Sequence, residues 1–239
     1  LASQKEYGEA IRHYQAALKI EPDSVRVLGN LANALASSGR SAEAIDHYRR
    51  ALSLHPRYAD AHYNLGLVLQ RHGNLAESIE HYQQAVRIRP DYAAAHNRLA
   101  AALIESGHIG DAFSHYREAV RLKPDWPAPM NDLAWILATH PDPEVRQPDE
   151  AIRLAEYAAE LTRHRNMNVL DTLAAAFAAA GRYDQAVSTA GRALAVATNA
   201  ASGPIVNQIE KRLDLYRRGR AYHESPGKEH RRSSIVLGD

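Results

Sequence analysis

The sequence predicts an all-α protein, an α-solenoid in which pairs of antiparallel helices stack along one axis. The first reason is a 34-residue period, which five columns of identical residues follow. The second is a set of apolar residues at helical spacing within each period. The third is a glycine and a proline at fixed places in the period, where helices are expected to end. The columns are Pro22, Pro56, Pro90 and Pro124; Gly39, Gly73 and Gly107; Leu31, Leu65, Leu99 and Leu133; Tyr14, Tyr48, Tyr82 and Tyr116; and Ala17, Ala51, Ala85 and Ala119.

One unit, from Val25 to Tyr58, shows how each element is predicted. Gly39 ends the first helix, because glycine tolerates the left-handed backbone of a helix stop. Ser41 can cap the second helix, and Pro56 ends it, because proline cannot continue a helix. The two apolar stripes are Leu28, Leu31, Ala32 and Leu35 in the first helix, and Ala44, Ile45, Tyr48, Ala51 and Leu52 in the second.

This pattern resembles the tetratricopeptide repeat (TPR), most clearly in the copy from Ala59 to Tyr92. The resemblance rests on the small residue after the first-helix leucine, the glycine between helices and the Ala–Tyr–Ala column of the second helix. It implies a right-handed superhelix that binds a protein or peptide in a concave groove. The aromatic residue often found early in the first helix is replaced by Leu28, His62 and His96. The pentatricopeptide repeat, an RNA reader of similar period, is disfavoured by the proline column and the lack of a basic groove.

The period also predicts how the chain is divided. The long inter-helix loop is expected over Thr139–Pro148, where Pro141, Pro143 and Pro148 interrupt the helical pattern and about five residues are added. The last helix is expected to cover the apolar face of the final repeat. The predicted parts are a partial unit at 1–24, three regular units at 25–126, a TPR-like unit with the long loop at 127–166, a unit at 167–203, a capping helix at 204–222 and a flexible tail at 223–239.

Both ends of the chain carry further expectations. Asn131–Glu224 resembles the end of large bacterial TPR proteins, in which the repeats often follow a membrane-embedded glycosyltransferase-like region. That resemblance implies an alternative function, in which these repeats recruit substrates for, or regulate, an enzyme whose catalytic part lies outside this chain. At the other end, Leu1 falls late in a first helix, so we expect a fragment of a longer array. Its open N-terminal edge would expose Ile11, Tyr14 and Leu18 and favour self-association.

Composition excludes several classes of protein. The chain has 239 residues, of which 45% are hydrophobic and 24% charged, as in ordinary soluble proteins. Its 29 basic and 28 acidic residues give a net charge of +1, which provides no electrostatic case for nucleic acid or an anionic membrane. Without cysteine, disulfides and thiolate chemistry are excluded, while cytoplasm and periplasm both stay open. The uncharged run Ala193–Ile209 is too polar to span a bilayer, so we expect no membrane insertion.

Polar residues of the first helices form the predicted partner-binding groove. Asn30 and Asn64 occupy equivalent positions one unit apart, and an amide both donates and accepts, so such a ladder can pair with a peptide backbone. It resembles the asparagine ladder of the O-GlcNAc transferase TPR region, from which it departs at Arg98 and Asp132. The other interpretation is that these asparagines only stabilise helix packing. The complete predicted set is Arg26, Asn30, Asn33, Asp60, Tyr63, Asn64, Asn97, Arg98, Asn131 and Asp132.

A chaperone-type carboxylate clamp is disfavoured. Asn33, Asn64 and Arg98 fall on three positions of such a clamp, but Gly29 and Ala94 stand where it needs lysine. Without those charges, the carboxylate would lose most of its charge-assisted hydrogen bonds.

Catalytic and metal sites are not predicted. The histidine column His13, His47, His81 and His115 places one imidazole in each unit, too far apart for zinc, so these residues are interpreted as surface histidines beside the packed tyrosines. We find no G-x-S-x-G, G-x-G-x-x-G, phosphate-loop or H-E-x-x-H motif. We therefore predict a scaffold with no enzymatic activity, no metal and no cofactor. The basic stretch Lys228–Ser234 is interpreted as part of a solvated tail.

Overall fold

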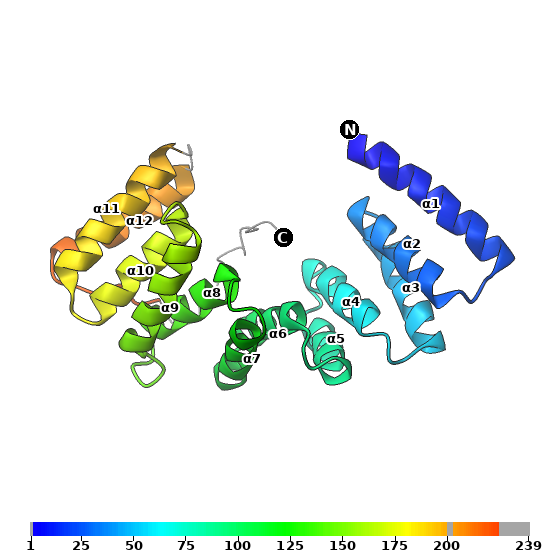
Figure 1. Ribbon diagram of the computed structural model, residues 1–239, viewed down its shortest axis with the longest axis horizontal. Coiled ribbons are helices and arrows are strands. Elements are labelled where there is room, and N and C mark those ends of the chain that lie inside the picture. The colour runs from blue at the N-terminus through cyan, green and yellow to red at the C-terminus, as the bar shows by residue number, and fades with distance from the viewer. Residues whose placement is uncertain (1, 200–202, 225–239) are drawn as a thin grey trace. The chain divides into compact units, whose positions relative to one another are not determined.

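A computed structural model of the chain describes residues 2–199 and 203–224. These residues form twelve α-helices and no strand, which confirms the predicted all-α fold (Figure 1). They divide into two compact units, of which unit 1 ends at His115 and unit 2 begins at Tyr116. The helices are α1 (Ala2–Ile20), α2 (Val25–Ser37), α3 (Ser41–Leu54), α4 (Ala59–Arg71), α5 (Leu75–Ile88), α6 (Ala93–Glu105), α7 (Ile109–Leu122), α8 (Pro127–Thr139), α9 (Pro148–Leu161), α10 (Met167–Ala179), α11 (Tyr183–Asn199) and α12 (Gly203–Arg217).

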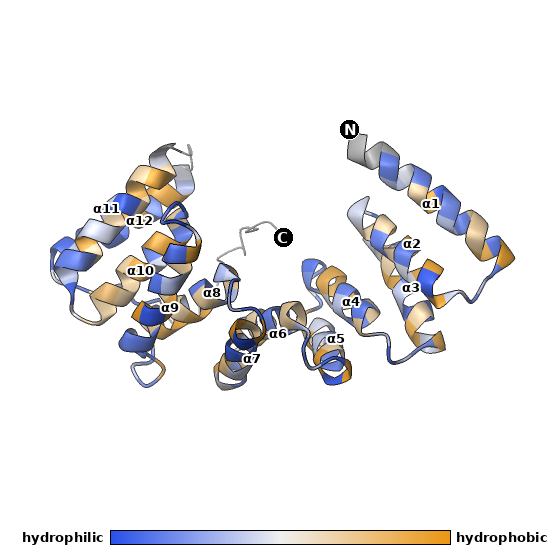
Figure 2. Ribbon diagram, viewed as in Figure 1, coloured by the Kyte–Doolittle hydropathy of each residue, from blue (hydrophilic) through white to orange (hydrophobic). Residues whose placement is uncertain are grey.

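Unit 1 is held together by the apolar stripes of its helices. Each helix from α1 to α5 packs against the next one in the chain. Figure 2 shows apolar and polar residues on different sides of these helices. The leucines of the first helices are completely buried, as the period predicts: Leu31, Leu35, Leu65, Leu69 and Leu99. Burial of each such side chain stabilises the fold by about 1.5–3 kcal/mol relative to leaving it exposed.

Glycine ends the first helix of each regular unit. Gly39, Gly73, Gly107 and Gly181 have φ angles of 84°, 80°, 83° and 74°, in the left-handed region that side chains disfavour. The residue after each glycine bonds back to the preceding helix; the backbone N–H of Arg40, for example, donates to the carbonyl of Leu35 at 2.8 Å. This arrangement satisfies carbonyl groups that the helix end leaves open. The predicted turns near these glycines are confirmed.

The tyrosine column of the second helices packs against the small residues of the first helices. Tyr48 and Tyr82 are almost completely buried. A Cβ atom added at Gly66 would come within 2.7 Å of the Tyr82 ring, so this residue must be glycine for the ring to keep its place. The hydroxyl of Tyr82 donates to Gln70 at 3.0 Å, whereas that of Tyr48 donates to Asn33.

The N-terminal edge differs from the prediction. Helix α1 runs without a break through Lys5, which stands where the other units have the glycine that ends a first helix. The predicted exposure of the apolar edge is wrong for Ile11, which is 4% exposed, while Tyr14 and Leu18 are half-buried. The reason is that α1 packs on α2 and adds these side chains to the core of unit 1. Among the described residues of α1, Ile20 is an exposed large apolar residue, and self-association stays a prediction.

The long loop of unit 2 is confirmed. Helices α8 and α9 are joined by eight non-helical residues, 140–147, whereas the turn at 38–40 has three, which gives the five extra residues that the period predicts. The guanidinium of Arg146 donates to the carbonyls of His140 at 2.7 Å and Pro141 at 3.0 Å, so the loop has internal support. Helix α9 begins at Pro148, a residue suited to the first turn of a helix.

The C-terminal end of unit 2 is attached to α8. Helix α12 packs on α11 and α10, as expected of a capping helix. The sequence predicts a flexible tail from His223 onward, but the backbone N–H of Glu224 donates to the carbonyl of Thr139 at 2.8 Å. The Glu224 carboxylate also accepts a 2.7 Å hydrogen bond from the indole of Trp135. The rest of the predicted tail, including Lys228–Ser234, lies outside the described residues.

The attachment of α12 generates a stability prediction. Arg212 donates to both carboxylate oxygens of Asp171 on α10, at 2.9 and 2.6 Å, and the two side chains are only 7% and 2% exposed. Removing one partner of a buried ion pair is strongly destabilising, because the other charge stays buried. We expect Arg212→Ala to lower the free energy of unfolding by about 3–5 kcal/mol, measured by urea denaturation.

The matched control for this prediction lies on the same helix. Arg218 forms a 2.8 Å ion pair with Asp214, but both side chains are more than half exposed. Exposed pairs contribute about 0–1 kcal/mol, so Arg218→Ala should leave the unfolding curve nearly unchanged. Equal losses in the two variants would contradict a special role for the buried pair.

Candidate partner-binding face

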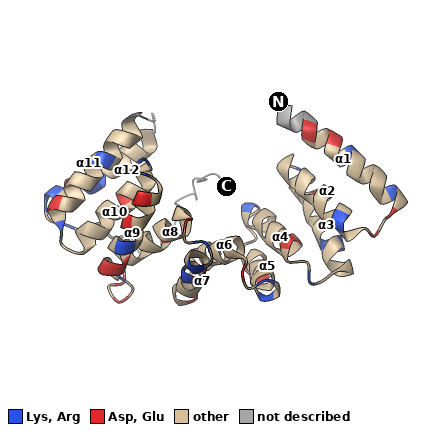
Figure 3. Ribbon diagram, viewed as in Figure 1, with Lys and Arg blue, Asp and Glu red and all other residues tan. Residues whose placement is uncertain are grey.

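The first helices of unit 1 carry most of the predicted site. We call the polar side chains of α2, α4 and α6 the first-helix face. Figure 3 shows few charges on these helices, and α2 has a single charged residue, Arg26, which is exposed. The predicted residues on this face are Arg26, Asn30, Asn33, Asp60, Tyr63, Asn64, Asn97 and Arg98, whereas Asn131 and Asp132 lie on α8 in unit 2.

A hydrogen bond joins two asparagines of the first-helix face that belong to neighbouring TPR-like repeats within unit 1. The Nδ2 atom of Asn64 on α4 donates to the Oδ1 atom of Asn33 on α2 at 2.9 Å. The same oxygen accepts the hydroxyl of the buried Tyr48, so both of its lone pairs are used. Nδ2 of Asn33 and Oδ1 of Asn64 have no hydrogen-bond partner among the described residues. The pair therefore presents a free donor and a free acceptor side by side, in a fixed orientation.

Asp60 and Tyr63 belong to a cluster that is satisfied internally. The carboxylate of Asp60 accepts hydrogen bonds from Arg89 and from the Tyr92 hydroxyl. Burial raises the pKa of Tyr92, and the Asp60 charge raises it further, which keeps the phenol protonated as a donor. Tyr63 packs on the Tyr92 ring at a centroid distance of 5.0 Å, and Arg89 lies 3.8 Å from the centroid of that ring. The sequence gives no sign that Asp60 is already paired.

The remaining residues of the face fall into two kinds. Arg98 is half-buried on α6 and forms no ion pair with any described residue. Asn97, beside it, is buried, and its Oδ1 atom has no hydrogen-bond partner within the described chain. In unit 2, Asn131 is likewise buried and donates to Asp132 at 3.3 Å, while its own Oδ1 lacks a partner among the described residues. Arg26, which is exposed on α2, likewise forms no ion pair with any described residue, so Arg26 and Arg98 are both cations of the first-helix face that stay open to a ligand.

Histidines form two pairs that sequence reasoning missed. The Nδ1 atoms of His62 and His81 lie 2.9 Å apart, and those of His96 and His115 lie 3.0 Å apart. In each pair the first-helix histidine also bonds a proline carbonyl through Nε2, His62 to Pro56 at 3.1 Å. The sequence does contain a signal for these pairs. His62 and His96 are 34 residues apart, and so are their partners His81 and His115.

No candidate metal centre emerges from these histidines. Within residues 2–199 and 203–224, no three His, Asp or Glu side chains gather where they could hold one metal ion. Each histidine pair is occupied by its own hydrogen bond and by the proline carbonyl. The pairs therefore act as polar links between a first helix and the second helix of the same unit.

In unit 2, part of α8 is covered by the end of the described chain. Trp135 bonds Glu224, its ring lies 5.9 Å from that of Tyr222, and the Arg212 guanidinium lies 5.3 Å from the Trp135 centroid. Sequence reasoning missed this contact. The signal was a tryptophan in a first-helix column that holds Asn33, Leu67 and Ala101 in the other units.

Comparison with protein families now decides what kind of repeat this is. The sequence profile described as the tetratricopeptide repeat matches residues 1–59, 30–93 and 63–127. These matches cover more than half of the chain. The chain belongs to the tetratricopeptide repeat family. Its helix pairs, glycine turns and tyrosine column are therefore those of TPR units, and the resemblance found in the sequence is confirmed.

Solved structures support the same fold. A TPR protein named YrrB, described as having an unusual peptide-binding site, matches with a TM-score of 0.70 and 18% identity, over 83% of this chain and 97% of that one. The MamA protein matches with a TM-score of 0.66 and 18% identity, over 76% of this chain and 96% of that one. A double mutant of MamA from RS-1 matches with a TM-score of 0.60 and 21% identity, over 66% and 86%. A comparison with curated proteins finds no match.

The TPR assignment leaves some expectations open. Within the described residues, no helix combines the length and the apolar character needed to cross a membrane. The upstream glycosyltransferase-like context implied by Asn131–Glu224 stays a prediction, since the matched structures and the profile show the repeats alone. TPR proteins are generally non-catalytic scaffolds, which agrees with the scaffold interpretation in its general form.

The His62–His81 pair predicts a pH dependence of stability. Burial lowers the pKa of His81 to about 4, with a further contribution from His62, against its ordinary value of 6.5. Between these values the unfolded chain binds more protons than the folded one, so stability falls as the pH drops from about 6.5 to about 4. We expect a loss on the order of 2 kcal/mol over this range, measured by urea denaturation at a series of pH values.

The variant His81→Gln should flatten this pH dependence. His13→Gln is the matched control, because His13 occupies the same column on α1 and is exposed. It should keep the pH dependence of the wild type. A wild-type stability that stays constant over the same range would contradict the prediction.

Proposed function

We propose that the chain is a protein-interaction scaffold and that its first-helix face binds an extended peptide segment of a partner. The observation that carries this proposal is the Asn33–Asn64 pair, which leaves one amide donor and one amide acceptor unused on an accessible surface. A peptide backbone offers the complementary groups, a carbonyl and an N–H, at every residue. Recognition of this kind tolerates many partner sequences.

The pair is oriented before any partner arrives. Asn33 is fixed by the hydroxyl of Tyr48, whose ring is held in the core, and Asn64 is fixed by Asn33. Side chains already held in the bound orientation lose less conformational entropy on binding, which increases affinity. This favours a role in binding over a purely structural role, for which the remaining donor and acceptor would have no use.

Arg98 would supply the charge at one end of the face. It lies on α6, which is the first helix of the repeat after that of α4, and it has no ion pair among the described residues. A guanidinium in this state can bind a carboxylate or a backbone carbonyl of the partner. Asp60, in contrast, is occupied by Arg89 and Tyr92, so its proposed role is to hold the end of α4.

The family and its relatives support this proposal in general terms. TPR units use helix pairs as a rigid frame for polar side chains, and one solved TPR protein of 18% identity is described as having a peptide-binding site. The proposed function needs no catalytic group.

The test uses peptides selected from a random library for binding to the whole chain. We expect Asn64→Ala to raise the Kd of a selected peptide about two- to tenfold, since a neutral hydrogen bond contributes about 0.5–1.5 kcal/mol. Arg98→Ala should raise the Kd about tenfold or more if the peptide carries an acidic group, because charged hydrogen bonds contribute about 1.5–3 kcal/mol. Fluorescence polarisation measures both values.

Asn64 is the cleaner of the two asparagines for this test. Asn33→Ala also removes the acceptor of the buried Tyr48 hydroxyl, so a loss of binding would mix with a loss of stability. Asn207→Ala on α12, an exposed asparagine of unit 2, is the matched control and should leave the Kd unchanged. Normal binding by both Asn64→Ala and Arg98→Ala would place the ligand elsewhere on the chain and refute the proposal.

A further inference from the structure

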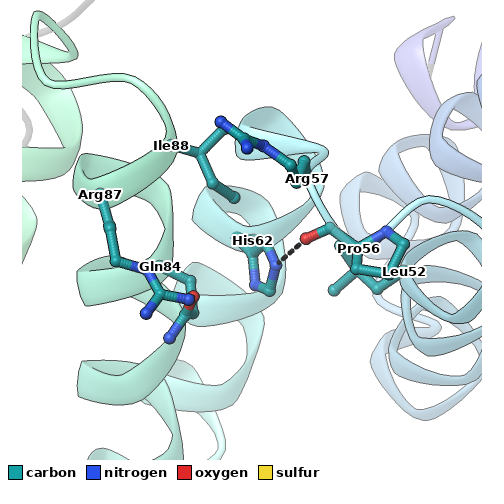
Figure 4. A pocket seen from close by; sticks show the side chains of 7 residues that line it. All are labelled: Leu52, Pro56, Arg57, His62, Gln84, Arg87 and Ile88. Carbon is teal, nitrogen blue, oxygen red and sulfur yellow. Dashed lines mark hydrogen bonds between the residues drawn. The ribbon is translucent and has the colours of Figure 1, made fainter.

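A second concave site lies in unit 1, apart from the first-helix face. It is a cavity of about 550 Å³ between the turn that joins α3 to α4 and the C-terminal half of α5. Figure 4 shows Gln84, Arg87 and Ile88 of α5 on one side and Leu52 and Pro56 on the other, with the His62 ring between them. The cavity is built from the end of α3, the turn that follows it and the helix pair α4 and α5, and no motif in the sequence pointed to it.

The cavity is positively charged and has no acidic lining residue. Arg57 and Arg87 both line it, and neither forms an ion pair with any described residue. Arg87 donates one hydrogen bond to Gln84, which leaves other N–H groups of its guanidinium open. His62 is committed to His81 and to the Pro56 carbonyl, so it contributes a wall of the cavity and no free donor. Two unpaired guanidinium groups at one cavity form a site for an anionic group.

The repeat itself shows that this charge is not a requirement of the fold. The residue after the turn proline is Asp23, Asp91 and Asp125 in the other units, and only at Arg57 is it a cation. One repeat earlier, Asp23 and Arg50 occupy the positions of Arg57 and Gln84, and they form a 3.0 Å ion pair. At the cavity both members of this ion pair are replaced: Arg57 stands in place of the aspartate, and the neutral Gln84 stands in place of the arginine. An internally neutralised site has thus become one with two open cations.

The rest of the lining indicates what kind of anion fits. Leu52, Pro56 and Ile88 form an apolar wall beside the two guanidinium groups. A free inorganic anion would leave this wall unused, whereas a peptide can place a carboxylate on the cations and a neighbouring aliphatic side chain on the wall. The shared geometry therefore favours an acidic peptide segment.

We propose that this cavity binds an acidic peptide segment of a partner protein, with acidic side chains paired with Arg57 and with Arg87 and an aliphatic side chain on Leu52, Pro56 and Ile88. The site does not depend on the first-helix face, because none of its lining residues is among those proposed to bind a peptide there. A partner that uses both sites would gain affinity from linked binding, while either site can exist without the other.

The decisive variant is Arg57→Asp, which restores the residue that the other units carry at this place. The fold is expected to tolerate it, since Asp23, Asp91 and Asp125 occupy equivalent turns. The probe is a fluorescent acetylated peptide of alternating glutamate and leucine, and its neutral counterpart has glutamine for glutamate. We expect the wild-type chain to bind the acidic peptide and Arg57→Asp to raise the Kd about tenfold or more. Arg87→Gln should have an effect of the same order.

Two control variants show whether the loss of binding belongs to this cavity. Arg192→Asp makes the same change of charge at an exposed arginine of α11 and should leave the Kd unchanged, which excludes a general effect of net charge. Asn64→Ala should also leave it unchanged, so failure at this cavity and failure at the first-helix face are distinguishable. Circular dichroism of Arg57→Asp should match that of the wild type.

Three results would overturn the proposal. The first is equal affinity of the wild type and Arg57→Asp for the acidic peptide. The second is equal affinity of the wild type for the acidic and the neutral peptide, which would remove the role of the carboxylate. The third is complete displacement of the peptide by inorganic phosphate at low millimolar concentration, which would identify a site for small anions and not for peptides.

Discussion

The close packing of a tyrosine ring against a small first-helix residue is the constraint on which the rest of this structure depends. At Gly66 even one added carbon would meet the Tyr82 ring at 2.7 Å, and the ring is buried and cannot move away. This contact sets the distance between the two helices of a unit. The tyrosine, the small first-helix residue and the glycine turn recur every 34 residues, so the same local packing pattern is available to successive repeats.

The hydroxyl groups of these buried tyrosines bond polar side chains that lie nearer the surface, and these partners differ from one repeat to the next. Tyr48 bonds Asn33, and Asn33 in turn holds Asn64. One unit later the column of Asn33 holds Leu67, which cannot accept a hydrogen bond, so Tyr82 bonds Gln70 instead. Two differences within the period, Leu67 in the column of Asn33 and Gln70 in the column of Ala36, therefore decide where the buried hydroxyl is satisfied and which surface amides are held in place. The buried Tyr48 and the surface residue Asn64 are thus linked through hydrogen bonds to the same Asn33 oxygen.

The sequence predicted the structural features that recur with the 34-residue period, but few of the contacts between particular side chains. The helix pairs, the glycine turns and the long loop at 140–147 follow from local patterns that repeat, so each copy supports the others. The Arg212–Asp171 ion pair and the attachment of Glu224 to Trp135 join residues that are far apart in the sequence and do not recur. The His62–His81 pair does follow the period, but two histidine columns do not by themselves show that their side chains meet. Their partners become visible only when helix packing is known. The burial of Ile11 was missed for the same reason, since it depends on how α1 packs on α2.

Departures from the period are informative because the period states what the fold requires. Three other repeats have aspartate in the turn where Arg57 stands, so the fold accepts aspartate there and does not require a cation. The same reasoning applies to Trp135, in a column of smaller residues, and there the cause is visible, since Tyr222 and Glu224 pack on it. At Arg57 no residue of the described chain supplies a matching acid. An exposed cation that no acid of the described chain neutralises, beside an apolar wall, is the observation on which the proposed acidic-peptide site rests.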